Sequence, residues 1–365
     1  MASPYLATKT TALASQSPVA PALARAAQIP LQSFSLPVFP PEAFSSGLES
    51  LILTSDVKLD EYAALLTQPF SVPDLPKSIT SLTLELFSLG YPPGFLGELG
   101  RKLGALKALT LYSQLFAGTT QDSRDDAINF IKTQTELKEV HVLDVFGPGG
   151  VFTDLMSALS PDVKFLEINY TFRHSDPQFL ASVPSKEILG GLEGRGALVG
   201  LTIGVSGPDV TDDEDDREGT EVGMRPVSGE GEAFVERIEN LGEGLILLDA
   251  TMFELSVGEV EKVLEVCKGV KILSVSVGLV NGWGEVLNVV GKEGKGAAVE
   301  QLEIVGVPGE ELVERLKGSG ELVVEKGELD ALGVRCKGLK TLKVSILRTR
   351  MEFWYKVGEE WVKKT

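Results

Sequence analysis

The chain has 365 residues, of which 43% are hydrophobic and 24% are charged. This composition supplies enough apolar side chains for a core and excludes a wholly disordered protein. The 52 acidic residues outnumber the 34 basic residues and give a net charge of -18, which repels phosphate backbones and anionic lipid. We therefore expect a basic protein or peptide as partner, and neither nucleic acid nor a membrane.

The cysteines and the N-terminus bear on the compartment. Two cysteines, Cys267 and Cys336, are too few for a disulfide framework, and we expect both to be buried core thiols. The N-terminus lacks a secretory signal pattern, and Lys9 and Arg25 make a poor mitochondrial presequence. The sequence therefore favours a cytoplasmic or nuclear protein.

The N-terminal segment is expected to be irregular. Residues 1–18 are small, polar and proline-containing, which predicts disorder. Residues 22–28 form an alanine-rich run with helical character, and Leu31, Phe34 and Leu36 follow among prolines. Because proline limits hydrogen bonding in a sheet, this stretch predicts a degenerate capping repeat.

From residue 48 onwards one short phrase keeps returning. In Leu106–Leu111 it reads LKALTL, with apolar residues in the order LxxLxL. The alternation predicts a half-buried strand, because successive side chains of a strand point to opposite faces. Copies begin 25 to 47 residues apart, within or near the periods of repeat proteins. The first positions are Leu48, Ile79, Leu106, Leu137, Val163, Leu198, Leu245, Val270, Val299 and Leu339.

Amphipathic helices are predicted between the strands. Apolar residues recur at the i, i+3, i+4 and i+7 spacing of one helix face. Ser256 with Glu259, and Ser123 with Asp126, have the spacing of N-cap pairs at the start of two helices. The runs with this spacing are residues 59–66, 152–159 and 260–267.

An internal copy supports the repeat: residues 267–275 and 336–344 share a cysteine, a lysine, a glycine and a following strand. We interpret Gly269 and Gly338 as helix stops in a left-handed conformation, each preceded by a lysine that suits the helix dipole.

Two segments fall outside the repeat. Residues 207–231 are rich in acidic side chains and predict a solvated loop; the alternative is an acidic element that contacts a basic partner or a divalent ion. The aromatic residues of 351–365 predict a C-terminal cap. The whole interpretation is an α/β fold: one solenoid over residues 19–350, with parallel strands on the concave face and helices on the convex face.

The strand phrase and its intervening helices resemble an irregular leucine-rich repeat of the ribonuclease-inhibitor-like kind, and the chain resembles uncharacterised fungal proteins of that type. The consensus of that family places Asn or Cys eight residues after the first Leu, whereas here those positions hold varied residues such as Asp56, Gln114 and Gly278. Ubiquitin-ligase adaptors also carry such repeats, so an adaptor role without a recognisable F-box is one alternative function.

The sequence contains few residues of the types that catalytic sites use. The only histidines are His141 and His174, so histidine-based metal sites and hydrolytic triads are not expected. The glycine-rich stretch 147–150 follows a strand but lacks a dinucleotide fingerprint. We predict no cofactor and no enzymatic activity; an enzyme using a carboxylate pair or this glycine-rich loop remains an alternative.

A binding surface follows from strand geometry. If the apolar positions of each phrase face the core, the residues two, four and six steps after the first position line the concave face. They combine carboxylates with aromatic side chains and suit a basic peptide; alternatively, the carboxylates merely keep an exposed sheet in solution. The candidate binding residues are Glu85, Thr110, Tyr112, Glu139, His141, Phe165, Glu167, Asn169, Asp249 and Glu303.

Overall fold

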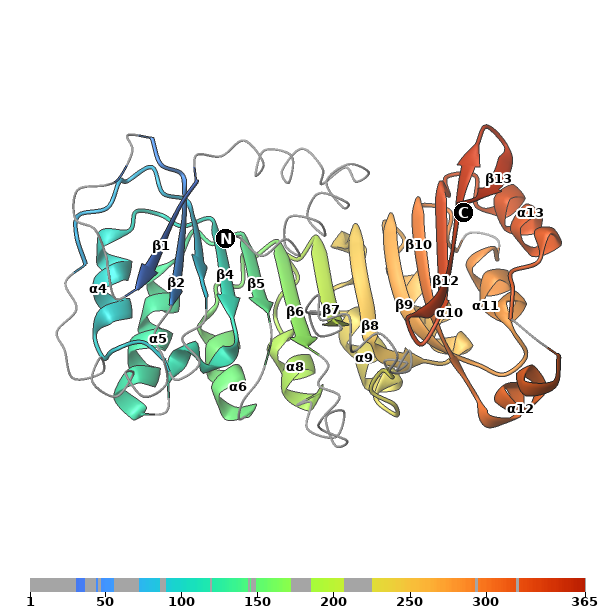
Figure 1. The fold of residues 1–365 in the computed structure, drawn as a ribbon, viewed down its shortest axis with the longest axis horizontal. Coiled ribbons are helices and arrows are strands. Elements are labelled where there is room, and N and C mark those ends of the chain that lie inside the picture. The colour runs from blue at the N-terminus through green and yellow to red at the C-terminus, as the bar shows by residue number, and fades with distance from the viewer. Residues whose placement is uncertain are drawn as a thin grey trace, which may run out of the picture. The chain divides into compact units, whose positions relative to one another are not determined.

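We analysed a computed structural model of the chain (Figure 1). The residues that it describes are 31–36, 44, 47–55, 72–85, 90–118, 120–143, 145, 149–171, 185–206, 225–292, 295–319 and 322–364. The chain divides into two compact units. Unit 1 comprises Met1–Val140 with Ala158–Ser160, and unit 2 comprises His141–Ser157 with Pro161–Thr365.

Unit 1 alternates strands with helices, and its strands β1 to β4 pair in parallel and in chain order. The strands are β1 (Leu31–Leu36), β2 (Ser50–Ser55), β3 (Ser81–Leu84) and β4 (Ala108–Tyr112). The helices are α4 (Phe95–Lys102), η1 (Gln114–Ala117) and α5 (Gln121–Thr133). Strand β5 (Glu139–Leu143) begins in unit 1 and ends in unit 2.

Unit 2 continues the same alternation. Strands β6 to β11 pair in parallel and in chain order, and two antiparallel strands follow. The strands are β6 (Phe165–Thr171), β7 (Gly200–Ser206), β8 (Leu247–Leu255), β9 (Ile272–Leu279), β10 (Gln301–Pro308), β11 (Thr341–Ile346), β12 (Thr349–Val357) and β13 (Glu360–Lys363). The helices are α6 (Gly149–Ala158), α8 (Ser185–Gly191), α9 (Gly231–Glu239), η3 (Gly242–Gly244), α10 (Val257–Val266), α11 (Trp283–Val290), α12 (Glu310–Ser319) and α13 (Lys326–Arg335).

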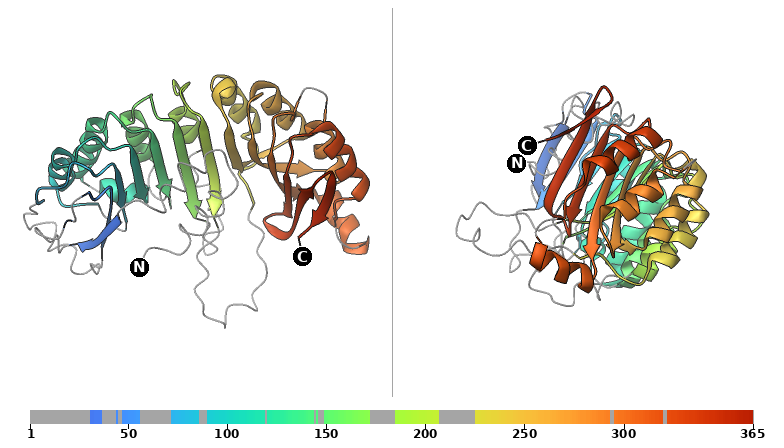
Figure 2. Two further views of the ribbon diagram at one scale, coloured as in Figure 1. Left: turned by 90° about the horizontal axis from the view of Figure 1, so that it is seen from above. Right: turned by 90° about the vertical axis from the view of Figure 1, so that its right-hand side faces the viewer.

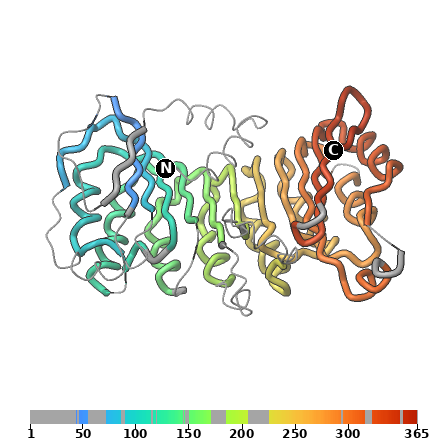
Figure 3. The backbone as a smooth tube through the Cα atoms, in the orientation of Figure 1, coloured from blue at the N-terminus to red at the C-terminus, as the bar shows by residue number. Residues whose placement is uncertain are grey.

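Each unit is therefore an α/β structure with parallel strands and alternating helices, which confirms the predicted fold class at this level. Helices α9, α10 and α11 contact β8 and β9, and in unit 2 they cover one face of the strands (Figure 2). The backbone of this unit passes from strand to helix and back in successive turns (Figure 3). We call the strand face opposite the helices the open face.

The core consists of the apolar positions of the repeated phrase. In all ten copies the first, fourth and sixth residues are at most 4% exposed. Leu106, Leu109 and Leu111, for example, are 0%, 0% and 1% exposed. The predicted strand register is thus confirmed, because a shift by one residue would have turned these side chains to the open face.

Helix α10 begins as the sequence predicts. The Ser256 hydroxyl accepts a hydrogen bond from the backbone N–H of Glu259, and the Glu259 carboxylate accepts one from the backbone N–H of Ser256. This reciprocal capping box satisfies two backbone donors that the helix itself leaves unpaired.

The predicted N-cap at Ser123 is wrong. Helix α5 begins three residues earlier, where the Thr120 hydroxyl accepts a hydrogen bond from the backbone N–H of Ser123. Asp126 instead accepts hydrogen bonds from the backbone N–H groups of Leu96 and Gly97 at 3.0 and 2.9 Å, and so caps the preceding helix α4. The spacing was that of a capping pair, but the acid serves a neighbouring repeat.

The left-handed helix stops predicted at Gly269 and Gly338 are also wrong, because neither glycine has a positive φ. Cys267 and Cys336 are the C-cap residues instead, with φ of -89° and -105°. Each cysteine carbonyl then accepts a hydrogen bond from the N–H three residues later, at 3.1 Å, which closes a four-residue turn into the next phrase. Both thiols are buried, as expected.

Successive repeats of unit 2 are joined by ion pairs between equivalent positions. Glu300 pairs with Lys271 at 3.0 Å on one side and with Lys340 on the other. These three residues each follow the first position of a phrase. Adjacent strands lie about 4.8 Å apart, so in-register residues of opposite charge meet.

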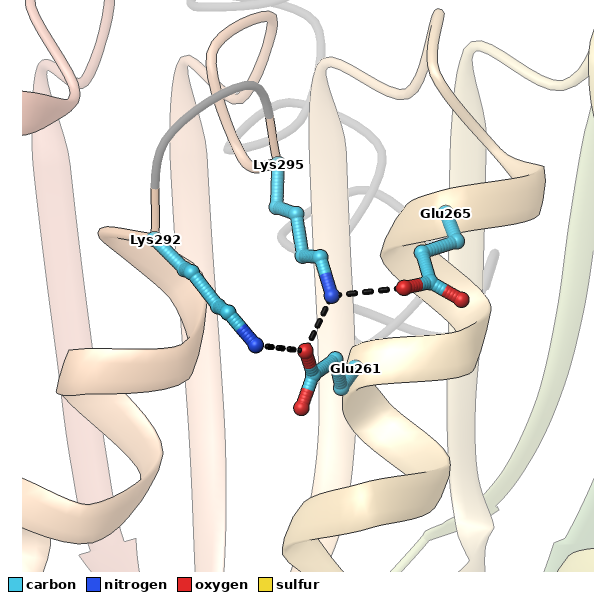
Figure 4. A network of polar contacts seen from close by, with 4 residues as sticks. All are labelled: Glu261, Glu265, Lys292 and Lys295. Atoms are coloured by element: carbon cyan, nitrogen blue, oxygen red, sulfur yellow. Dashed lines mark hydrogen bonds and ion pairs between the residues drawn. The ribbon is translucent and has the colours of Figure 1, made fainter.

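A second ionic network lies at helix α10 (Figure 4). Lys292 and Lys295 both pair with Glu261, and Lys295 also pairs with Glu265 at 2.6 Å. Hydrogen bonds from the two lysines lower the pKa of Glu261 to about 2. The network ties α10 to the segment that follows α11, so it joins neighbouring repeats.

Several sequence predictions lie outside the described residues. They are the disordered segment 1–18, the helical runs at 22–28 and 59–66, and most of the acidic loop 207–231, of which only 225–231 is described. The single solenoid over 19–350 and the cap over 351–365 stay predictions; residues 349–357 form strand β12 and residues 360–363 form strand β13.

Leu109→Ala should lower the free energy of unfolding by about 2 to 5 kcal/mol, because it removes a fully buried side chain and leaves a cavity. Urea unfolding monitored by circular dichroism would measure the change. Thr110→Ala, on the open face of the same strand, is the matched control and should cost less than about 1 kcal/mol. Equal effects of the two variants would contradict the inward placement of Leu109.

Candidate functional site

In unit 1 the structure places four of the predicted binding residues on the open face. Glu85 lies just beyond β3, Thr110 and Tyr112 lie on β4, and Glu139 begins β5. All four are half-buried, in alternation with the fully buried core positions. This partial burial raises the pKa of Glu85, since a carboxylate loses solvation there.

In unit 2, His141 and Glu167 meet across adjacent strands. The distance from His141 Nδ1 to Glu167 Oε2 is 2.7 Å, and the two side chains are 26% and 24% exposed. Phe165, two residues before Glu167, packs against Gly200 of β7: a Cβ at Gly200 would lie 2.5 Å from its Cδ1. The glycine thus provides the space for an aromatic side chain on the open face.

Glu303 lies on β10 and pairs with Lys343 of β11 at 2.8 Å. Their side chains are 30% and 36% exposed. The two residues are partners in the strand register. This ion pair therefore arises, like those of Glu300 with Lys271 and Lys340, from opposite charges at equivalent positions of adjacent repeats.

Two further candidate binding residues, Asn169 and Asp249, form hydrogen bonds within the protein itself. Asn169 is 8% exposed, and its backbone carbonyl accepts a hydrogen bond from the N–H of Val145 at 3.0 Å. Asp249 Oδ1 accepts hydrogen bonds from the N–H of Thr251 at 3.0 Å and from its hydroxyl at 2.7 Å. Burial raises the pKa of Asp249, although the positive charge of Arg348 opposes this shift.

Arg348 completes this cluster and was not predicted from the sequence. Its guanidinium donates to the hydroxyl of Thr251 and to the backbone carbonyl of Val205. The arginine stands in the turn between β11 and β12, where Leu347 and Arg348 have φ of 48° and 65°. Positive φ at both central residues suits a tight hairpin but is uncommon for residues other than glycine.

In unit 2, three acidic candidate residues each lie near one basic side chain. His141 pairs with Glu167, and Lys343 pairs with Glu303. The positive charge of Arg348 acts on Asp249. Two of these three bases occupy the equivalent open-face position of a neighbouring strand: His141 on β5, before Glu167, and Lys343 on β11, after Glu303. Sequence alignment of the repeats could therefore have predicted those two pairs, whereas Arg348 comes from outside the repeat pattern.

The described ranges also bear on metal-ligand groupings, the glycine-rich stretch and apolar helices. No three His, Cys, Asp or Glu side chains there come together as metal ligands would. The glycine-rich stretch 147–150 is described only from Gly149, where helix α6 begins. No helix among the described residues combines the length and apolar composition that a membrane crossing needs.

Comparison with known proteins adds no family to this picture: no family model matches the chain, and no curated protein matches it significantly.

Asp249→Asn should stabilise the protein increasingly as the pH rises. A raised folded-state pKa means that protonated Asp249 contributes stability that is complete below the unfolded pKa of about 3.9 and is lost as pH rises through the folded pKa. Asparagine keeps an acceptor for Thr251 without the charge. Urea unfolding between about pH 4 and pH 8 would measure the difference.

The exposed Asp330, on helix α13, provides the control substitution Asp330→Asn. Its effect should not vary in this way. If the difference in free energy of unfolding between Asp249→Asn and wild type stays constant with pH, burial of the Asp249 carboxylate is not unfavourable.

Proposed function

We propose that this protein is a non-enzymatic scaffold, built as a leucine-rich-repeat-like solenoid, that binds a basic protein segment on the open face of its strands. The observation that carries this proposal is the pair of half-buried carboxylates on the open face of unit 2, Glu167 and Glu303. They offer negative charge on a rigid sheet, while the protein as a whole carries a net charge of -18. Both properties favour a cationic partner.

The present ion pairs do not prevent such binding. Each joins side chains that are about a quarter to a third exposed, and ion pairs of this kind contribute about 0 to 1 kcal/mol. An arginine of a partner can form two parallel hydrogen bonds to one carboxylate, which is stronger than a single contact. A partner arginine can thus replace His141 or Lys343 at low cost.

Phe165 adds an apolar contact beside Glu167. Its ring lies over Gly200 and remains partly accessible on the open face. Aromatic side chains of this kind often anchor protein interfaces, where they bury a large area with little loss of conformational freedom. Asp249 differs, because its hydrogen bonds to Thr251 already occupy it, and we assign it a structural role.

Glu167→Gln combined with Glu303→Gln should weaken binding of a labelled arginine-glycine peptide. Two ion pairs of about 0.5 to 1 kcal/mol each correspond to a loss of roughly five- to thirtyfold in affinity. Binding should also become less sensitive to salt, because fewer charges are screened. Fluorescence anisotropy at two salt concentrations would measure both quantities.

The matched control is Asp154→Asn combined with Glu236→Gln. Both residues are exposed and lie on helices α6 and α9. Their substitution removes the same two negative charges as the open-face double variant. The control should bind the peptide as wild type does. If the two double variants lose affinity equally, the attraction is a property of net charge and the open-face proposal fails.

A further inference from the structure

A groove lies at the carboxyl ends of the strands β8, β9 and β10 in unit 2. Its volume is about 1350 Å³. The ends of these strands and residues near the beginnings of α9, α10, α11 and α12 line it. None of the predicted open-face residues lines it. Carboxyl ends of parallel strands are common ligand-binding places in open α/β sheets, because the loops there are free to vary.

Part of the groove wall is an apolar strip that solvent can reach. The strip consists of Val257, Val280, Pro308 and Val313. Val280 is 61% exposed, although it directly follows β9, and the other three residues are half-buried. Leu255 and Leu279, which also line the groove, are 0% and 1% exposed and belong to the core. A partly exposed apolar strip beside core residues suits the apolar side chains of a docked segment.

Acidic side chains line the same groove. Six glutamates and Arg225 line the groove, and the guanidinium of Arg315 donates to the backbone carbonyls of Val280 and Asn281 at 3.3 and 2.9 Å. No ion pair within the described residues involves Glu232, Glu254 or Glu310. The six are Glu232, Glu254, Glu259, Glu285, Glu310 and Glu314.

The helix beginnings at the groove do not favour an anionic ligand. Glu259 already caps α10, with a distance of 2.6 Å from its Oε2 to the N–H of Ser256. Glu285 accepts hydrogen bonds from the N–H groups of Val280 and Asn281 at 2.8 and 3.1 Å. Carboxylates therefore complement these backbone donors and would repel a phosphate. The described residues also contain no cluster of three metal ligands.

We propose that this strand-end groove is a second docking surface, which binds a basic amphipathic segment of a partner protein. Apolar side chains of the segment contact the strip around Val280, and its lysines or arginines face Glu232, Glu254 and Glu310. Charge complementarity selects this occupant over a phosphate ligand or over a second copy of this acidic chain. The inference does not depend on the open-face proposal, because the two surfaces share no residue.

Two kinds of substitution test the groove. The probe is a labelled peptide with leucine and lysine at helical spacing, compared with a scrambled isomer of the same composition. Glu232→Gln with Glu310→Gln should weaken its binding roughly five- to thirtyfold and reduce its salt dependence. Val280→Ser should weaken binding fivefold or more while the salt dependence stays as in wild type, because it removes only apolar contact.

The control is Asp154→Asn with Asp330→Asn, two exposed residues on α6 and α13 that line neither the groove nor the open face, which should leave binding of the amphipathic peptide unchanged. Thermal melting would verify that all variants are folded. Equal binding of the peptide and its scrambled isomer would overturn the proposal, as would wild-type affinity in the groove variants. Calcium binding, or dimerisation of wild type, that the groove substitutions abolish would assign the groove to another occupant and equally overturn it.

Discussion

In-register pairing of parallel strands is the constraint on which this structure depends. Leu82 of β3 lies beside Leu109 of β4, and Leu302 of β10 lies beside Leu342 of β11. Because adjacent strands are about 4.8 Å apart, each position of the phrase forms a column of neighbouring side chains. Apolar columns make the core of each unit. Polar columns of opposite charge, such as that of Lys271, Glu300 and Lys340, join the repeats at their edges.

The same constraint shapes the candidate binding face. A charged side chain on one strand stands next to the equivalent side chain of the next, as Glu167 does with His141 and Glu303 with Lys343. The open face therefore carries partly exposed ion pairs that cost little to exchange. Strand ends escape this constraint, since each loop has its own length and sequence. That freedom allows glutamates and the exposed Val280 to gather in the groove beyond β8, β9 and β10.

Strand β8 departs from the regular register, and the departure has structural consequences. Ala250 pairs with Val275 and Glu254 with Ser276, so the three residues 251–253 are additional. Phe253 uses this extra length to stack on Phe234 of α9, with ring centroids 5.1 Å apart. Thr251 links Asp249 to Arg348 on the other side. A bulge of this kind redirects side chains that a regular strand would alternate.

The amino-acid sequence by itself determined the α/β class, the buried positions of the phrase from Leu48 to Val344, the buried thiols and the capping box of Ser256. These features repeat at the period of a strand or a helix, so neighbouring residues in the sequence are enough to specify them. The tertiary structure alone decided that Asp126 caps another helix, that the chain leaves α10 and α13 without a left-handed glycine, and that Arg348 reaches Thr251. It also decided the position of the groove. Such contacts join residues far apart in the chain, and turns, bulges and loop lengths, which have no period in the sequence, set their geometry.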